Sequence, residues 1–182
     1  MKSTSFPRLW RIAVTSMIAA CADAGDSNRL APTAPSFTTV NLGTCTDLAA
    51  SGEPTFHAYA DGVQIYRWSG ASWVFVAPRA TLYADAQVSA AVASHYAGPT
   101  WESVSGSTVV GAVAKRCMPN SNAIPWLLLD ATSSAGPGVF DGVTQIQRVN
   151  TVGGVAPSTG GSVVGEIAEV PYTAEYFFYR GQ

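Results

Sequence analysis

The residues best suited to chemistry lie in one short stretch, His95-Tyr-Ala-Gly-Pro-Thr-Trp-Glu102. It brings an imidazole, a carboxylate and two aromatic rings to the two sides of a Gly-Pro turn, which can fold the flanking side chains toward one spot. One interpretation is a ligand cleft, with His95 and Glu102 as polar partners and Trp101 as a stacking platform. The other is structural: Trp101 belongs to the core, and His95 hydrogen-bonds the backbone.

We take His95, Tyr96, Trp101 and Glu102 as candidate ligand-binding residues, and add Arg148, which stands near Asn150 in a later strand. An inward arginine needs a partner for its charge, because an unpaired buried ion is costly. Glu102 or Glu175 would serve as that partner. The tyrosines near the C-terminus, Tyr172, Tyr176 and Tyr179, are more typical of core and rim positions than of a binding surface.

Other recognisable chemistry is missing from the sequence. The chain has 2 histidines and no spacing of ligands typical of a metal site. It has neither the glycine pattern of a dinucleotide site nor a nucleophile elbow. We therefore predict no metal, no cofactor and no catalytic residue. A non-catalytic module that binds a glycan, a small ligand or a partner protein is favoured, and the alternative is a hydrolase-like enzyme with His95 and Glu102 as base and acid.

The elements that must position these residues have the pattern of β-strands. Short runs rich in Val, Ile, Thr and aromatic residues are separated by Gly, Pro, Asp, Asn and Ser. We predict a single all-β domain from 37 to 182, an antiparallel sandwich or barrel of about eight to ten strands. Asp61-Gly62 and Ser69-Gly70 suit tight hairpins. The Ala-rich stretch 84–97 also allows a helical turn, because Val88, Ala91, Val92 and His95 have helical spacing.

The start of the chain predicts export. Lys2, Arg8 and Arg11 precede a short apolar run, as in a signal peptide over residues 1–20. The run ends in Ile18-Ala-Ala-Cys21, which resembles the lipobox of bacterial lipoproteins. That resemblance implies cleavage before Cys21, acylation of its sulfur and a membrane anchor, with residues 21–36 as a flexible tether. We expect the protein in the bacterial cell envelope, at the outer membrane or cell surface, with a glycan or another envelope component as its partner.

The charge content argues against nucleic-acid binding, and the cysteine content predicts a disulfide. Charged residues make up 12% of the chain, against about 25% in ordinary domains. After Cys21 there are 7 basic and 12 acidic residues, a net charge of −5, so the dense basic footprint of a nucleic-acid-binding protein is absent. Two cysteines, Cys45 and Cys117, are left after lipidation. In an exported protein such a pair predicts one disulfide, although two unpaired buried thiols are the alternative.

Six phrases in order carry a resemblance to a known family. They are Gly62-Val-Gln-Ile-Tyr66, Trp73-Val-Phe-Val-Ala-Pro78, His95 to Glu102, Ala123-Ile-Pro-Trp-Leu-Leu-Leu129, Gln147-Arg-Val-Asn-Thr151 with Gly153-Gly-Val-Ala-Pro157, and Val170 to Tyr179. Together they resemble the domain of unknown function 3455 of bacteria and fungi, over about Asp61 to Tyr179. The family has no established activity, so the resemblance implies a boundary rather than a function.

The chain departs from that family at two positions. The resemblance implies cysteines where this chain has Trp68 and Gly161, and those two cysteines are interpreted as a disulfide pair. Both are missing here, while Cys45 and Cys117 lie outside the shared phrases. The interpretation is that one disulfide has been exchanged for another. Closing a loop of about 70 residues stabilises a fold by roughly 4 kcal/mol in the chain-entropy model.

Overall fold

The structure is a computed structural model that describes residues 40–181. The predicted signal peptide, the lipidation site at Cys21, the tether and the start of the domain at Phe37 lie outside these residues. The described part has one 3₁₀ turn and eight strands: η1 (Thr46–Leu48), β1 (Glu53–Trp68), β2 (Trp73–Tyr83), β3 (Ala91–Tyr96), β4 (Thr100–Ser103), β5 (Thr108–Cys117), β6 (Trp126–Ala135), β7 (Val143–Gly153) and β8 (Ile167–Arg180).

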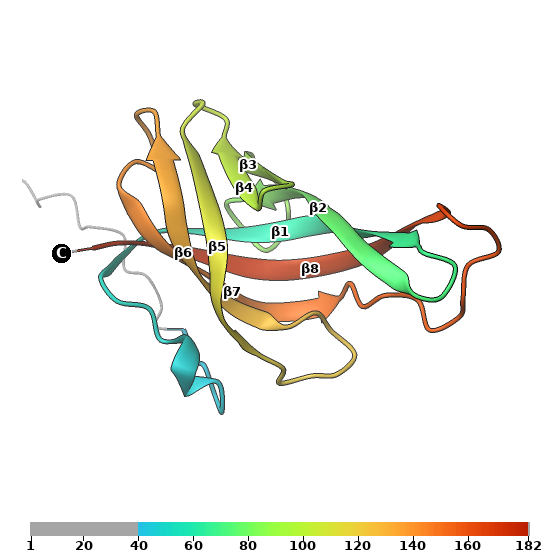
Figure 1. Cartoon of the computed structure of the whole chain (residues 1–182). Helices are drawn as coiled ribbons and strands as arrows, with labels where there is room; N and C mark the ends of the chain where they lie inside the picture. The colour runs from blue at the N-terminus through green and yellow to red at the C-terminus, as the bar shows by residue number, and fades with distance from the viewer. Residues whose placement is uncertain (1–39, 182) are drawn as a thin grey trace, which may run out of the picture. The chain divides into compact units, whose positions relative to one another are not determined.

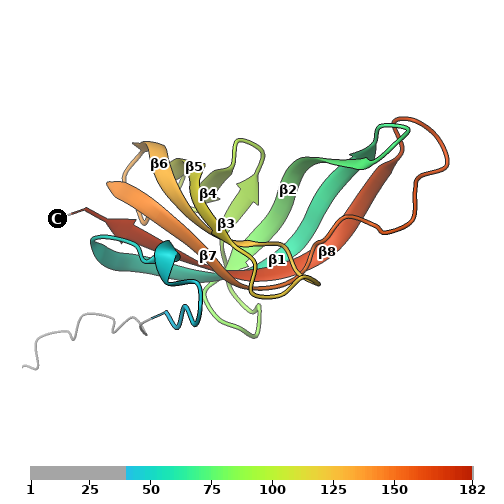
Figure 2. The same cartoon turned by 60° about the horizontal axis from the view of Figure 1, so that its bottom comes forward.

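Every strand pairs antiparallel with the next one along the chain, and β8 pairs with β1, so that the sheet closes into a ring (Figure 1). The prediction of an all-β antiparallel domain is confirmed, and of the two architectures expected the chain adopts the barrel. The ring is not a regular cylinder. β1, β2 and β8 extend together to one side, beyond the ends of the other strands (Figure 2).

The two predicted hairpins have different outcomes. Ser69-Gly70 does turn the chain between β1 and β2, with the Ser69 amide donating to the Ser72 carbonyl at 2.9 Å and Gly70 at φ 95°. Asp61-Gly62 does not turn; it lies in the middle of β1 and pairs with both β2 and β8. A Cβ at position 62 would overlap the backbone of Arg79 and Ala80. Glycine is therefore needed there for close strand approach rather than for a turn.

The helical alternative for residues 84–97 is wrong. Residues 91–96 form β3, and the preceding loop is organised by Asp85. The Asp85 carboxylate accepts hydrogen bonds from the Gln87 amide at 2.9 Å and from the Ser89 hydroxyl at 2.5 Å. An aspartate that bonds its own following backbone offers the chain an alternative to a helix.

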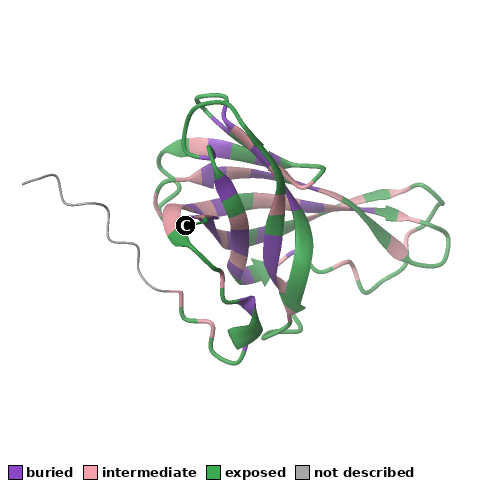
Figure 3. Cartoon of the chain, turned by 60° about the vertical axis from the view of Figure 1, so that its left-hand side comes forward, coloured by how far each residue is buried: buried purple, intermediate pink, exposed green. Residues whose placement is uncertain are grey.

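One end of the barrel is filled by phenylalanines. The rings of Phe140 and Phe178 lie 4.7 Å apart, and Phe56 packs within 5.7 Å of Phe140. Phe56 lies on β1 and Phe178 on β8, while Phe140 lies in the turn before β7, and all three belong to the core. Figure 3 shows buried bands that interrupt exposed ones along several strands. Val143 and Ile146 of β7 both lie in the interior, because an irregularity in the pairing with β8 between Val143 and Gln145 interrupts the strict alternation of faces.

Residues 40–50 cover part of the outside of the barrel. Leu48 of η1 is fully buried beside Leu128. A second cluster of buried hydrophobic side chains includes Phe177. Cys45 and Cys117 form a disulfide with their Cα atoms 5.7 Å apart, so the predicted pairing is confirmed and the two-thiol alternative is wrong. A structural disulfide is typical of proteins outside the cytoplasm.

The positions where the family is expected to carry its other disulfide lie side by side. A Cβ on Gly161 would come within 2.7 Å of the Trp68 ring. The Trp68 backbone also bonds the same loop, donating to the Glu166 carbonyl at 2.8 Å and accepting from Gly165 at 2.9 Å. Packing of a large indole on a glycine thus occupies the place where a covalent bond would otherwise hold this loop to β1.

The ring is incomplete on one side, because the β3–β4 hairpin is short. β2 pairs with β3 only from Ala80 onward, and β4 pairs with β5 only up to Val110. Within residues 40–181, the 73–79 part of β2 and the 112–117 part of β5 therefore have a sheet neighbour on one edge only. The two strands diverge below the hairpin (Figure 1). Among these same residues, no helix is long and apolar enough to cross a membrane.

Candidate functional site

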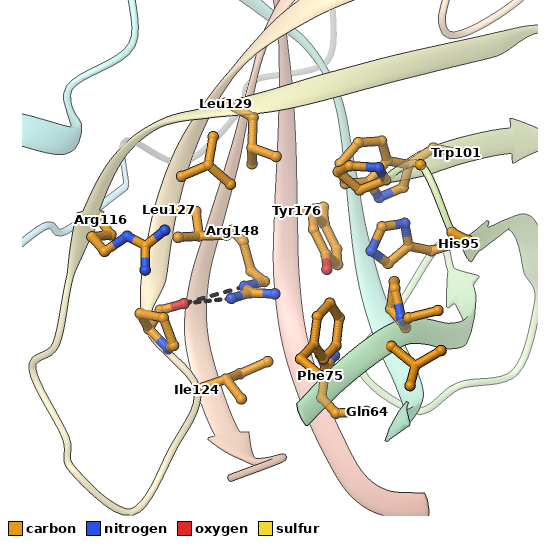
Figure 4. A pocket seen from close by; sticks show the side chains of 18 of the residues that line it. Gln64, Phe75, His95, Trp101, Arg116, Ile124, Leu127, Leu129, Arg148 and Tyr176 are labelled. Carbon is orange, nitrogen blue, oxygen red and sulfur yellow. Dashed lines mark hydrogen bonds between the residues drawn. The ribbon is translucent and has the colours of Figure 1, made fainter. Parts of the chain in front are cut away.

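A cavity of about 550 Å³ opens between the diverging parts of β2 and β5 and reaches into the barrel. Among the residues that line it, Phe75 of β2 and Val113 of β5 are exposed, whereas Trp101 and Leu129 are fully buried. The walls are mainly apolar (Figure 4). A volume of this size falls within the roughly 300–1,000 Å³ of small-molecule sites.

His95 and Trp101 form one inner wall of the cavity. They are directly opposite each other across the β3–β4 hairpin, and their rings stack with centroids 4.3 Å apart. His95 is 3% exposed and Trp101 1%. The His95 Nδ1–H donates to the Thr100 carbonyl at 2.9 Å, which assigns the proton of the neutral ring to Nδ1. Burial lowers the pKa of the imidazole to about 3, so His95 is neutral at ordinary pH.

Tyr96 and Glu102 point to the opposite face of the same hairpin. Both are exposed, and the Tyr96 hydroxyl donates to the Glu102 carboxylate at 2.9 Å. Because successive side chains of a strand alternate between faces, the hairpin separates this pair from His95 and Trp101. The structure thus does not bring His95 and Glu102 to a shared substrate position, and it offers no geometry for the base-and-acid pair of the hydrolase alternative.

The Trp101 ring is not an open stacking platform. His95 covers one face, while Tyr176 and Phe178 approach edge-on at 5.4 and 5.9 Å. This matches the structural interpretation for the ring. The indole Nε1–H, however, is buried without a hydrogen-bond partner among the described residues. Trp101 therefore presents a single donor rather than a surface for a sugar.

Arg148 points inward and lines the cavity (Figure 4). Its Nε and Nη2 donate to the Pro125 carbonyl at 3.2 and 2.9 Å. The expected ion pair between Arg148 and Glu102 or Glu175 is not formed. Glu175 binds His57 and Asn150 outside the barrel, and Glu102 binds Tyr96. Within residues 40–181 no carboxylate lies within 4.0 Å of the Arg148 guanidinium.

Gln64 and Tyr176, which line the cavity, and Tyr172, which lies beside them, were not predicted as site residues. The amide nitrogen of Gln64 and the hydroxyls of Tyr172 and Tyr176 are buried, and none makes a hydrogen bond of good geometry within the described chain. They lie close enough to influence one another: burial chiefly, and then the Tyr176 hydroxyl, raise the pKa of Tyr172. Tyr172 and Tyr176 are an even number of residues apart in β8, so strand alternation puts both on one face, and the sequence contains that signal.

The second histidine lies outside the barrel. His57 Nε2 is 2.9 Å from a Glu175 oxygen, and its ring stacks on Phe177 at 4.0 Å. Burial lowers its pKa, although the hydrogen bond to Glu175 and the charge of that carboxylate oppose the shift. Across residues 40–181, no three His, Cys, Asp or Glu side chains gather as a metal site would need.

Comparison with known proteins adds a family but no activity. Residues 49–180 match the family described as "Protein of unknown function (DUF3455)", a longer stretch than the phrases noted in the sequence. No curated protein and no solved structure matches the chain.

Proposed function

We propose that this chain, which belongs to the DUF3455 family, is a binding module that holds a small, largely apolar ligand inside its barrel. The observation that carries the proposal is the cavity of about 550 Å³ at the incomplete side of the ring. Eight-stranded barrels have an interior just wide enough to be filled by side chains or to hold one small ligand. Here phenylalanines fill one end and leave the other hollow.

The polar groups in the cavity support binding rather than catalysis. A ligand site combines apolar walls with a few well-placed polar groups, and the side chains of Gln64, Trp101 and Tyr176 have that arrangement. His95 is neutral and held by a backbone carbonyl, and the carboxylate that could work with it is on the outer face. Of the partners considered from the sequence, a small ligand fits this cavity better than a glycan, which would need an exposed ring face.

The test is a fluorescence titration of the purified protein with N-phenyl-1-naphthylamine, a neutral apolar dye that brightens when it leaves water. We expect saturable binding to one site per chain. Val113→Trp, which puts a large ring at the exposed part of the lining, should weaken binding by about tenfold or more, because an occupied pocket cannot take the dye. Val104→Trp is the matched control, since Val104 is 79% exposed and does not line the cavity.

Two outcomes would contradict the proposal. One is the absence of saturable dye binding by the wild-type protein. The other is equal affinity in the Val113→Trp and Val104→Trp variants, which would place the dye elsewhere on the surface. Circular dichroism of both variants establishes that each is folded.

We further propose that the protein is exported and anchored to a membrane through a lipid on Cys21. The disulfide supports an extracytoplasmic location, and the basic and apolar start of the sequence supports a signal peptide. In a bacterial host, Cys21→Ala should move the protein from the membrane fraction to the soluble fraction. Mass spectrometry that found an intact Met1–Ala20 segment on the mature wild-type protein would overturn this proposal.

A further inference from the structure

We infer that the ligand is an amphipathic anion, whose compact oxyanion head binds Arg148 and whose apolar body lies against the inner walls of the barrel. The inference deepens the proposed function and rests on it, because it names the chemical class of ligand for the same cavity. It is carried by the charge of the cavity lining, by the buried hydrogen-bond donors in it and by the position of its apolar side chains.

The charge in the cavity is of one sign. Arg148 and, at the exposed rim, Arg116 line the cavity, and no carboxylate does so. Arg148 is half-buried, and its Nη1 group has no hydrogen-bond partner within residues 40–181, since the Pro125 carbonyl takes only Nε and Nη2. A guanidinium partly removed from water is stabilised by an anion that it can bond directly, and such charge-assisted bonds are the strong ones.

The other unsatisfied groups also favour a ligand rich in acceptors. The Trp101 indole N–H and the Gln64 amide nitrogen are donors only, and both are buried without a hydrogen bond of good geometry in the described chain. The same holds for the Tyr176 hydroxyl, which lines the same cavity and lies close enough to Tyr172 to add to the effect of burial in raising the pKa of that phenol. By contrast, Tyr66 in the same wall is satisfied, because its hydroxyl donates to the Gly154 carbonyl at 2.7 Å. Oxygen acceptors on a ligand in the cavity would satisfy these donors.

The remaining walls require an apolar body. Leu127 and Leu129 stand on the Arg148 side of the cavity, Ile124 lies on the other side of the guanidinium, and Phe75 faces it across the space (Figure 4). These side chains offer no hydrogen bonds, so a small hydrophilic anion such as inorganic phosphate would lose its hydration without compensation along most of its surface. An anion attached to an aromatic or aliphatic body loses less.

The experiment compares two dyes that share an anilinonaphthalene body. 1-Anilinonaphthalene-8-sulfonate carries an anionic head, and N-phenyl-1-naphthylamine does not. Dissociation constants of both are measured for the wild-type protein and for Arg148→Met, which keeps the length of the side chain and removes its charge. We expect Arg148→Met to weaken sulfonate binding by about tenfold or more, as for the loss of a hydrogen bond to a charged group. Binding of the neutral dye should change by less than about twofold.

Two further variants control for charge and for folding. Arg148→Lys keeps the positive charge and should retain most of the sulfonate affinity. Arg67→Met removes an exposed arginine that does not line the cavity, and should change neither constant. The unchanged neutral-dye constant shows that the Arg148→Met cavity is folded. Should Arg148→Met fail to bind the neutral dye, Arg148→Lys decides. Retained affinity for both dyes supports the inference, and a loss of sulfonate affinity of about tenfold or more overturns it.

The outcomes separate the inference from the proposed function. If the wild-type protein binds the neutral dye and Arg148→Met leaves the sulfonate constant unchanged, the anionic head is wrong and the binding module stands. If Arg148→Met weakens both dyes equally, Arg148 only shapes the cavity, and the inference fails in the same way. If the wild-type protein binds neither dye, the proposed function fails and takes the inference with it.

Discussion

The two ends of the barrel interior are built from different chemistry on the same strands. At one end Phe56, Phe140 and Phe178 pack ring against ring, and no polar side chain is left unsatisfied among them. At the other end Gln64 and Tyr172 stand on β1 and β8 beside a cavity, with polar atoms that no described residue satisfies. Strands β1 and β8 contribute to both ends, so the same two strands carry packed rings at one end and unsatisfied polar groups at the other.

If the cavity binds a ligand as proposed, the filled end serves stability and the hollow end serves binding. Burying apolar rings stabilises the fold by the area removed from water. Burying an unpaired donor costs free energy, typically about 1–3 kcal/mol for each group. The unpaired donors around the cavity lower the stability of the fold, and the packed phenylalanine rings at the other end offset this loss. Three measurements test this contrast.

The largest effect should come from the filled end. Phe178→Ala removes a fully buried ring in contact with Phe56 and Phe140, and we expect the free energy of unfolding to fall by about 3–5 kcal/mol. Urea denaturation followed by tryptophan fluorescence measures the change. Val104→Ala, at a position 79% exposed, should stay within about 0.5 kcal/mol of wild type. A loss below about 1.5 kcal/mol in Phe178→Ala would mean that this end is not the stabilising one.

The next effect is a pH dependence that comes from the hollow end. Burial lowers the pKa of His95 from 6.5 to about 3, so below pH 6.5 the unfolded chain binds a proton that the folded chain refuses. Stability must therefore fall as the pH falls, by about 1.4 kcal/mol per pH unit, or about 2 kcal/mol between pH 6.5 and 5. Denaturation curves at these two pH values measure the slope.

His95→Gln should remove most of this slope, because an amide does not titrate and can still donate to the Thr100 carbonyl. His57 contributes with the same sign, since burial lowers its pKa too, so His57→Gln serves as the comparison and should remove a smaller part. An unchanged slope in His95→Gln would show that the ring is not held neutral inside the barrel.

The smallest effect distinguishes satisfied from unsatisfied hydroxyls. Tyr176→Phe deletes a buried hydroxyl with no described partner, and we expect it to be neutral or to raise the free energy of unfolding by about 1 kcal/mol. Tyr66→Phe deletes a hydroxyl that donates to the Gly154 carbonyl at 2.7 Å, and should lower it by about 1 kcal/mol. Thermal unfolding of the two variants beside wild type gives the signs. Equal destabilisation by both would mean that Tyr176 has a partner in solution.

The strand pattern made the fold class predictable, because turn residues and alternating apolar positions are local signals. Alternation also contained a constraint on the site: His95 and Trp101 are an even number of residues apart, as are Tyr96 and Glu102, so a hairpin between them puts each pair on one face. The cavity itself was not predictable. It depends on β3 and β4 being shorter than β2 and β5, and strand ends are the least definite feature of a local pattern. The environment of Arg148 depends on contacts between strands far apart in sequence.

Gly62 shows the same limit. A glycine after an aspartate is a strong local signal for a hairpin, but here the requirement comes from β2, whose backbone lies where a Cβ would be. The requirement for glycine cannot be read from the sequence of either strand alone. The Trp68–Gly161 contact is comparable, because its meaning appears only when the loop 154–166 is seen against the end of β1.

The free edges of β2 and β5 carry a consequence for solubility. Unpaired strand edges expose backbone donors and acceptors, and they are templates on which a second chain can add and start aggregation. Two known defences stand at these edges. Pro78, which has no N–H to donate, interrupts the unpaired part of β2, and the adjacent charges Lys115 and Arg116 occupy the unpaired part of β5. The gap proposed to admit a ligand is thus also a place where a second chain could add, and the residues beside it are those that proteins use to prevent such pairing.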